Sequence, residues 1–422
     1  AEGEAWQEAA WLEGGGAAWL GGGWRASVLQ EAAYRPWDGL PCPAAGLAMD
    51  LGSAVFKAGS ARGWAAGGPD GDPQVLWTAQ VGSVRGAARR RAFVGAECED
   101  KQLAAELLLQ APVVAGAVAS WPAVEGIAAR AYAALGAAAD EETLALVTNA
   151  GTDVEALAQL FFETFEAPRL LVCCQEAAAL ASQRRVTGLC LSIGHGWCRA
   201  VAVYRGCPIA HSAIQSPLTA ERVTAHVRDG LDWDAHARLF GTCDQRSRTR
   251  ITQMAIAGRM SVHSSSGARP TAEEQVREGV VATPARLFQA LPQRLVAGLD
   301  VAAGPALLEA LFSPELMLGE GRAGLGLPAL LDAALRRCPG ELQPLLANNV
   351  LLAGGMAGVP GLAARVEEEL SLLTQRRGLP PARVRGCGPS SDLAAWRGAL
   401  LLHALHAPPE VTLAEYNEAG PA

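Results

Sequence analysis

Lysine is almost absent from this chain of 422 residues, in which only Lys57 and Lys101 occur and arginine supplies the rest of the 35 basic charges. Basic charge is also outnumbered, since 43 acidic residues give a formal net charge of −8. A surface that coats nucleic acid or docks on an anionic membrane needs the opposite balance. We therefore expect neither direct nucleic-acid binding nor membrane association.

Two further features are missing. The ten cysteines form no Cys-x-x-Cys pair, which favours buried free thiols over a zinc site. No apolar run approaches the ~18 residues of a membrane-spanning helix, and the first residues show no basic region followed by an apolar core, so we expect no secretory signal. Half of the residues are hydrophobic and 18% are charged, a globular composition long enough for two lobes.

One glycine turn organises the rest of the chain. Residues Met49 to Gly59 read MDLGSAVFKAG, an aspartate followed by a Gly-Ser pair, an apolar run and a lone lysine. We expect a strand that ends near Asp50, a tight turn at Gly52 because glycine admits backbone angles that other residues resist, and then a second strand. Such a turn directs N–H groups and the Ser53 hydroxyl at one point, as a phosphate requires. Alone, the motif is more typical of an ordinary β-turn than of a phosphate site.

Two later stretches have related patterns. Leu189 to Gly206 reads LCLSIGHGWCRAVAVYRG, two apolar strands around a Gly-x-Gly turn, and Asn349 to Gly361 reads NVLLAGGMAGVPG, a strand followed by a Gly-Gly pair. The order and spacing of the three stretches resemble the actin family, with its two phosphate loops and the segment that contacts the nucleotide's sugar and base. The resemblance covers roughly residues 46–421. It includes the runs FFETFEAP at 161–168, VTG at 186–188, WRG at 396–398 and EYNEAGP at 415–421.

The resemblance implies an α/β fold of two actin-like lobes, each built on a ribonuclease H-like βββαβα core, around a central cleft that holds the nucleotide. We expect the first lobe over residues 46–182, completed by 394–422, and the second over 183–393. Strand hairpins are expected over 46–81 and from Leu189, and further strands over 144–148 and 170–174. Helices are expected from Trp121 to 136 and over 154–165, 175–182, 219–230, 306–312, 327–337, 361–373 and 391–406.

Residues 1–45 differ from the rest, because they hold five of the eleven tryptophans among Gly, Glu and Ala: Trp6, Trp11, Trp19, Trp24 and Trp37. Actins have nothing comparable there. Two interpretations stay open, a disordered or loosely docked extension and a partner-binding arm, since exposed tryptophan favours interfaces.

The resemblance also implies roles for single residues. Asp50 would contact the water shell of a divalent cation, as a weak metal contact, and Gln175 would orient the attacking water, a role that the rest of the site makes vestigial. Ala54 stands where actins commonly carry glycine. The residues that we expect at the nucleotide are Asp50, Gly52, Ser53, Lys57, Gly194, His195, Gly196, Gly354, Gly355 and Met356.

The second loop departs from the family's pattern. Actins read Asp-Ser-Gly-Asp-Gly there, whereas residues 192–196 read Ser-Ile-Gly-His-Gly, so both carboxylates are gone. His195 offers an imidazole that is neutral or positive near pH 7 and that could contact phosphate itself. Arg199 stands near the position of a second water-orienting residue, and Asp392 near that of a lysine against the base. Three outcomes remain open: Mg-ATP is bound, ATP or ADP is bound weakly or without Mg, or the cleft is empty.

We therefore expect a divergent actin-related protein with a degenerate nucleotide site. It would be a structural subunit of a larger cytoskeletal, ciliary or motor, or chromatin-remodelling assembly, in the cytoplasm or cytoskeleton, with the nucleus as the alternative. The rival is a polymerising, nucleotide-binding actin-like ATPase. A sugar-kinase-like enzyme of the same superfold is disfavoured, because no acidic base stands out. Homopolymers are not expected, because the loop that carries Arg89, Arg90 and Arg91 is short and charged where actin subunits present an apolar tip.

Overall fold

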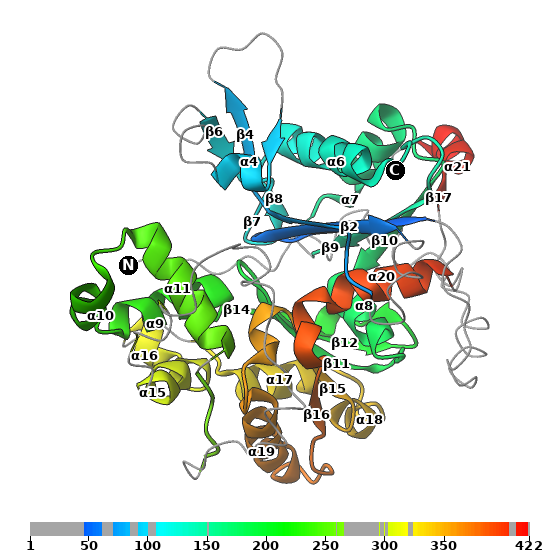
Figure 1. Cartoon of the computed structure of the whole chain (residues 1–422). Coiled ribbons are helices and arrows are strands. Elements are labelled where there is room, and N and C mark those ends of the chain that lie inside the picture. The colour runs from blue at the N-terminus through cyan, green and yellow to red at the C-terminus, as the bar shows by residue number, and fades with distance from the viewer. Residues whose placement is uncertain are drawn as a thin grey trace, which may run out of the picture. The chain divides into compact units, whose positions relative to one another are not determined.

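A computed structural model gives the fold of the chain (Figure 1). It describes residues 46–60, 71–84, 92–99, 107–149, 152–258, 260–265, 295, 299, 303–319, 324–404 and 411–420. The predictions for residues 1–45 and for Arg89–Arg91 lie outside these ranges. The chain divides into two compact units: Ala1–Val186, Arg205–His211 and Ala395–Ala422 form the first, and Thr187–Tyr204 and Ser212–Ala394 form the second. Among the described helices, none is long and apolar enough to cross a membrane.

A mixed sheet of six strands forms the centre of the first unit. Its order is β17-β10-β9-β1-β2-β3, in which β1 is antiparallel to β2 and parallel to β9, and β9 is parallel to β10. The strands are β1 (Leu47–Leu51), β2 (Val55–Ser60), β3 (Val75–Thr78), β9 (Leu144–Thr148), β10 (Arg169–Cys174) and β17 (Val411–Thr412). The expected first hairpin and the strands over 144–148 and 170–174 are therefore confirmed.

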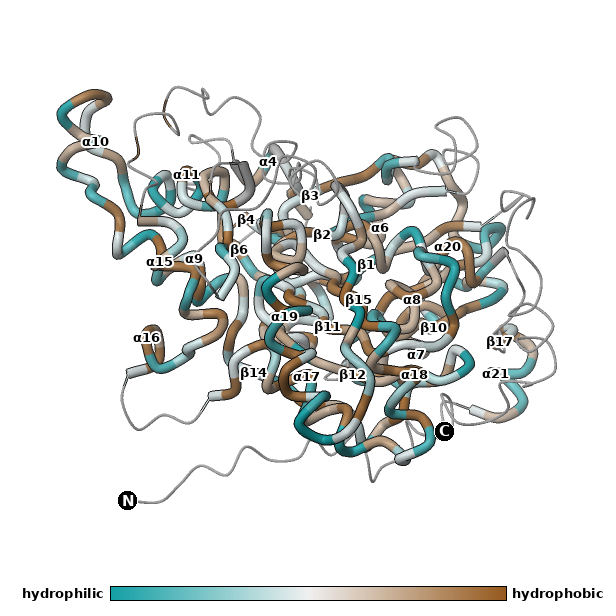
Figure 2. The backbone as a smooth tube through the Cα atoms, turned by 90° about the horizontal axis from the view of Figure 1, so that it is seen from below, coloured by the Kyte–Doolittle hydropathy of each residue, from teal (hydrophilic) through white to brown (hydrophobic). Residues whose placement is uncertain are grey.

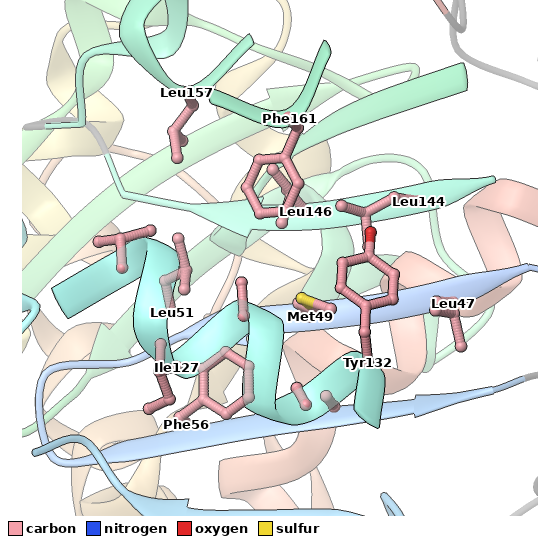
Figure 3. Close-up of a cluster of buried hydrophobic side chains, with 14 of the residues drawn as sticks. Leu47, Met49, Leu51, Phe56, Ile127, Tyr132, Leu144, Leu146, Leu157 and Phe161 are labelled. Carbon is pink, nitrogen blue, oxygen red and sulfur yellow. The ribbon is translucent and has the colours of Figure 1, made fainter. Parts of the chain in front are cut away.

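Helices cover both faces of this sheet, as Figure 1 shows for α6 on one side and for α8 and α20 on the other. The helices of the unit are α6 (Trp121–Leu135), α7 (Val154–Gln159), α8 (Gln175–Ser182), α20 (Ala394–Ala404) and α21 (Leu413–Ala419). Alternate residues of β1 face the two layers, because side chains alternate along a strand. Met49 packs with Phe56 and Ile127 under α6 (Figure 3), whereas Ala48 packs with Trp396 of α20.

The expected helix over residues 154–165 is α-helical only in its first half. After α7, residues Leu160–Thr164 form a π-helical turn, η2. Two neighbouring aromatic residues, Phe161 and Phe162, are both buried in this turn, and they stack on Phe165 and Tyr416 respectively. The wider turn therefore accompanies the burial of two consecutive large rings in one core.

Two small sheets complete the first unit. The strands β4 (Val81–Val84), β5 (Phe93–Val94) and β6 (Leu107–Gln110) pair in the order β5-β4-β6, beside the short helix α4 (Ala96–Glu99), and β7 (Val113–Val114) pairs with β8 (Ala117–Val118). The β7–β8 turn places Ala115 and Gly116 at φ 49° and 83°. Positive φ at both central residues is typical of a type I′ hairpin. No strand was expected there, because the turn lacks the usual Asn-Gly or Asp-Gly pair.

The second unit contains a sheet in the order β12-β11-β15-β16, with β14 beside β12. Its strands are β11 (Gly188–Ile193), β12 (Cys198–Tyr204), β14 (Ile214–Ser216), β15 (Val350–Ala353) and β16 (Val384–Gly386). Strands β11 and β12 are antiparallel and β15 is parallel to β11. The expected hairpin at Leu189 is therefore confirmed.

The helices of the second unit fall into two groups (Figure 1). Those at the sheet are α17 (Leu327–Arg336), α18 (Gln343–Ala347) and α19 (Leu362–Gln375); the others are α9 (Ala220–Gly230), α10 (Trp233–Phe240), α11 (Gln245–Gly258), α15 (Gly304–Leu308) and α16 (Glu315–Leu318). The short 3-10 turns η4 (Glu309–Leu311), η5 (Gly355–Gly358) and η6 (Gly388–Leu393) follow α15, β15 and β16 respectively. Leu362, Val366 and Leu370 are buried residues of α19 and form the apolar stripe of an amphipathic helix. The colours of α19 in Figure 2 accordingly include both hydrophobic and hydrophilic stretches.

Candidate nucleotide-site elements

The first glycine turn joins β1 to β2, whose last cross-strand pair is Leu51 and Phe56. Gly52 is needed there for space, not for backbone angle, because its φ is not in the left-handed region. A Cβ at Gly52 would lie 2.4 Å from the carbonyl oxygen of Val55. The sequence therefore identified the correct glycine, but the reason given for it was wrong.

A buried ion pair lies directly beneath this turn. Asp50 and Lys57 are cross-strand neighbours, and the lysine Nζ donates to Asp50 Oδ2 over 2.6 Å. Both residues are buried, at 7% and 6% exposure. The hairpin register thus brings together two residues that the sequence proposed for one site. Ser53 is half-buried in the turn itself. The Asp50 carboxylate neutralises the ammonium group of Lys57.

Gln175 is the first residue of α8 and directly follows β10. Because β1, β9 and β10 are parallel, with Asp50 opposite Val147 and Val147 opposite Cys173, their carboxyl ends share one edge of the sheet. Gln175 and the first turn therefore lie at the same edge.

The next residue in the chain, Glu176, was not expected to matter. It is fully buried, and its Oε2 accepts a hydrogen bond from Cys174 Sγ at 2.9 Å. Sequence reasoning missed it because an acidic residue in the first turn of a helix is ordinary.

The second glycine turn joins β11 to β12 and is closed by a hydrogen bond of 2.7 Å from Gly194 N to Trp197 O. Helix α9 holds the turn from outside. Its first two N–H groups, those of Ala220 and Glu221, donate to the carbonyl oxygens of Gly194 and His195 over 2.9 and 3.0 Å. These carbonyls are thus hydrogen-bonded to a helix N-terminus, where the four leading N–H groups lack intrahelical partners. Gly196 completes the half-buried tip.

Two positively chargeable side chains belong to this hairpin. Burial lowers the pKa of His195 below its ordinary value of 6.5, while the nearby Glu221 carboxylate acts in the opposite direction. His195 is therefore neutral at pH 7. Arg199 is the cross-strand partner of Ser192, and both are buried, at 5% and 0% exposure. The Arg199 guanidinium lies 5.3 Å from the ring centre of Trp197. Sequence reasoning missed this contact, although residues two positions apart in a strand share one face.

The third stretch begins where β15 ends. Gly354 has φ +93°, and a Cβ there would lie 2.5 Å from the carbonyl oxygen of Ile193. Its peptide is held on both sides by Ser391, which accepts from Gly354 N at 3.1 Å and donates Oγ to Gly354 O at 3.0 Å. Since β11 and β15 are parallel, Gly354 and the second turn share one sheet edge. Gly355 has open space where a Cβ would be, and Met356 is buried.

These elements offer few ligands to a divalent cation. Magnesium prefers oxygen ligands and is usually bound by one or two carboxylates. Of the carboxylates expected at the two turns, only Asp50 is present, and it is paired with Lys57. Across the described residues, no group of three or more His, Cys, Asp or Glu side chains is arranged to hold a metal ion. The second turn in particular offers an imidazole and a buried arginine, which do not fit Mg²⁺.

Comparison with known proteins identifies the family. A family model described as "Actin" matches residues 43–239 and 303–422, which include all three glycine stretches. The chain belongs to the actin family. Among its relatives, actin-like protein 9 of mouse is 26% identical over 416 residues, covering 94% of this chain and 91% of the relative. Actin-like protein 9 of cattle is likewise 26% identical, with coverage of 94% and 91%. The expectation of a divergent actin-related protein with an actin-like α/β fold is thus confirmed.

Proposed function

We propose that this actin-family protein is a structural subunit of a larger assembly and turns over ATP negligibly. The observation that carries the proposal is the second turn, where Ser192 and His195 replace two family carboxylates and burial keeps the imidazole uncharged. Charge-assisted hydrogen bonds contribute about 1.5–3 kcal/mol each. Loss of two such contacts to the water shell of a cation would lower cation affinity by roughly 10²–10⁴-fold, at about 1.4 kcal/mol per factor of ten.

Gln175 alone does not restore hydrolysis. Phosphoryl transfer depends mainly on positioning and on electrostatic stabilisation of the transferred group, for which enzymes of this kind use bound metal ions. A glutamine can orient a water molecule but cannot supply that charge. A protein that keeps the fold but loses the cation's ligands can still bind other proteins through its surface. We propose that the partner subunits of the assembly bind to this surface.

The partners we propose are protein subunits of a cytoskeletal, ciliary or motor complex in the cytoplasm. The alternative is that the protein is a subunit of a chromatin-remodelling complex in the nucleus. Neither nucleic acid nor a membrane is proposed as a partner. Homopolymers are not proposed either, because of the charged residues Arg89–Arg91, which lie outside the described part of the chain.

Three measurements on the purified full-length protein test the proposal. ATP turnover should equal that of the Gln175→Ala variant, pelleting on ultracentrifugation should not occur, and native extract should yield fixed stoichiometric partners. A turnover rate in the range of assembled actin that Gln175→Ala abolishes, or filaments of the pure protein in electron micrographs, would instead establish the rival function of a polymerising ATPase.

A further inference from the structure

Two neighbouring apolar side chains are exposed where α10 ends, in a segment that we call the α10–α11 corner, residues 238–246. Leu239 is 68% exposed, more than any other large hydrophobic residue in the described part of the chain, and Phe240 is exposed as well. The helix ends at Gly241, which has φ +84° and no described atom within 4 Å of the position that a Cβ would take. The corner is therefore open to solvent.

The packing of α10 explains why these two side chains are left outside. The buried residues of this helix are Trp233 and His236. Phe240 contacts His236, with 5.2 Å between the ring centres, so only part of its ring is covered. A single exposed leucine is ordinary on a protein surface, and the apolar pair acquires meaning only from the charges around it.

Those charges are basic. Residues 238–250 contain four arginines and one acidic residue, Asp244, in a chain whose net charge is −8. Asp244 Oδ1 accepts from Ser247 N at 2.8 Å, so the carboxylate caps the first turn of α11. Arg238 and Arg246 are exposed on either side of the apolar pair along the chain. Apolar side chains flanked by arginines are complementary to an acidic segment that carries large apolar residues of its own.

Three helices hold the corner in place. The Arg248 guanidinium of α11 lies 5.3 Å from the ring centre of Trp233 in α10, and Trp233 Nε1 donates to the carbonyl oxygen of Arg228 in α9 at 2.7 Å. Arg228 in turn donates to Thr249 Oγ1 of α11 at 3.2 Å. Helix α10 lies at one end of the second unit in both Figure 1 and Figure 2. A partner would thus meet a surface that is already ordered, which lowers the entropy cost of binding.

We propose that the α10–α11 corner binds an acidic amphipathic segment of a partner protein. Leu239 and Phe240 are the apolar anchors, and Arg238 and Arg246 contact carboxylates of the partner. The inference rests on the proposed function, because it names one surface by which partner subunits bind. Such a partner would be particular to this chain and its near relatives, since Phe240 and all of α11 lie outside the ranges that the actin family model matches.

Two other occupants fit the corner less well. In a symmetric contact with a second copy of the chain, each basic corner would face the same basic corner of its partner. An anionic membrane attracts arginine and apolar side chains, but it would repel a chain whose net charge is −8. The acidic protein segment is favoured because it satisfies both the charge and the apolar pair.

Binding of a synthetic peptide to the full-length protein tests the proposal. The probe is an amphipathic helical peptide with glutamate on its polar face and leucine on its apolar face, and fluorescence anisotropy gives its dissociation constant. We expect it to bind at least about tenfold more tightly than a peptide with lysine in place of each glutamate. Its binding should weaken as the NaCl concentration is raised, because salt screens exposed charges.

A double variant places the binding at the corner. Arg238→Gln/Leu239→Ser should weaken binding of the acidic peptide by at least about tenfold, because burying one leucine side chain is sufficient for such a factor. The matched control is Leu372→Ser/Arg376→Gln, which changes a leucine that is 51% exposed and an exposed arginine on α19 of the same unit. It should leave the dissociation constant unchanged. Circular dichroism checks that both variants fold, and Leu239→Ser alone replaces the first if it does not.

Four results would overturn the inference. The acidic peptide does not bind at millimolar concentration, the lysine peptide binds as tightly, or the corner variant and the control variant bind alike. The fourth result is a different occupant, shown by sedimentation of the wild-type protein with phosphatidylserine vesicles or by a dimer that Leu239→Ser dissociates.

Co-purification from native extract separates this inference from the proposed function. If fixed partners are retained but the acidic peptide does not bind, the inference fails and the proposed function stands. If the peptide binds as expected but the pure protein forms filaments and turns over ATP, the proposed function fails and the chemistry of the corner stands.

Discussion

Removing the Lys57 ammonium should destabilise the first unit strongly. In Lys57→Met the methylene stem is largely kept, so the packing between β2 and its neighbours changes little, but the Asp50 carboxylate loses the cation that lies 2.6 Å away. The side chains of Lys57 and Asp50 are only 8% and 10% exposed. Water therefore cannot replace the lost partner, and an uncompensated charge is left inside the protein.

The size of the effect follows from this burial. Removing one partner of a buried ion pair costs about 3–5 kcal/mol. For a unit of roughly 150–250 residues, each kcal/mol lowers the melting temperature by about 2–4 °C, so ~3 kcal/mol corresponds to a decrease of roughly 6–12 °C. Replacing both partners by neutral residues is often close to neutral, so Asp50→Asn/Lys57→Met should recover more than half of the loss.

Thermal unfolding followed by circular dichroism measures these differences. The matched control is Arg130→Met in the same unit, which breaks the Arg130–Glu97 pair, whose side chains are 40% and 31% exposed. Exposed pairs contribute about 0–1 kcal/mol, so the control should lower the melting temperature by less than about 4 °C. If Lys57→Met melts like Arg130→Met, or if the double variant melts below Lys57→Met, the pair does not hold the hairpin as argued.

Three other outcomes are expected. Gly398→Ala should destabilise the first unit by ~1–3 kcal/mol or more, because the added Cβ would lie 1.6 Å from the carbonyl oxygen of Ala178. In the control Gly340→Ala, no atom lies within 4 Å of the added Cβ. Its free energy of unfolding in urea should therefore change by less than about 0.5 kcal/mol. Burial lowers the pKa of His195 from 6.5, so the unfolded chain protonates this residue at a higher pH than the folded chain does. The free energy of unfolding should therefore fall as the pH drops below 6.5. His195→Asn should lose this part of the pH dependence between pH values of about 5.5 and 7.5. Deletion of residues 1–40, which hold the five N-terminal tryptophans, should leave the melting temperature unchanged and should abolish co-purification with partner proteins. A large drop in the melting temperature with co-purification unchanged would show instead that this segment is part of the fold.

Local signals in the sequence were sufficient for most elements. Helix α8 spans the predicted residues Gln175–Ser182. Helix α9 begins one residue after the predicted start at Thr219, which caps it by accepting from Arg222 N through Oγ1. Strands and helices with a clear period and a capping residue are specified by their neighbours in sequence. The β7–β8 hairpin escaped prediction because its strands have two residues each and its turn contains Ala115 at positive φ, a conformation that alanine rarely adopts.

The sequence predicted which residues belong to the candidate site, but not which contacts they make. The cross-strand position of Asp50 and Lys57 follows from the hairpin register, which a turn of known length fixes. In contrast, the clamp of α9 on the second turn joins Glu221 to His195, two residues that no sequence period connects. The burial of Glu176 likewise depends on packing around β10. Such contacts are set by tertiary structure, so the chemistry of the turn could be inferred from its residue types but its environment could not.

The pairing of β10 with β17 and the bond of Trp396 to β1 have a consequence for the synthesis of the protein. Leu170 pairs with Val411, and Trp396 Nε1 donates to Ala48 O across 348 positions of sequence. The first unit therefore cannot complete its sheet or its second core layer until the ribosome has released nearly the whole chain. Until then, one edge of β10 and the small-residue face of β1 stay uncovered in the nascent protein. The second unit, whose residues are contiguous apart from 205–211, can fold before the first unit, because residues 395–422 of the first unit are synthesised last.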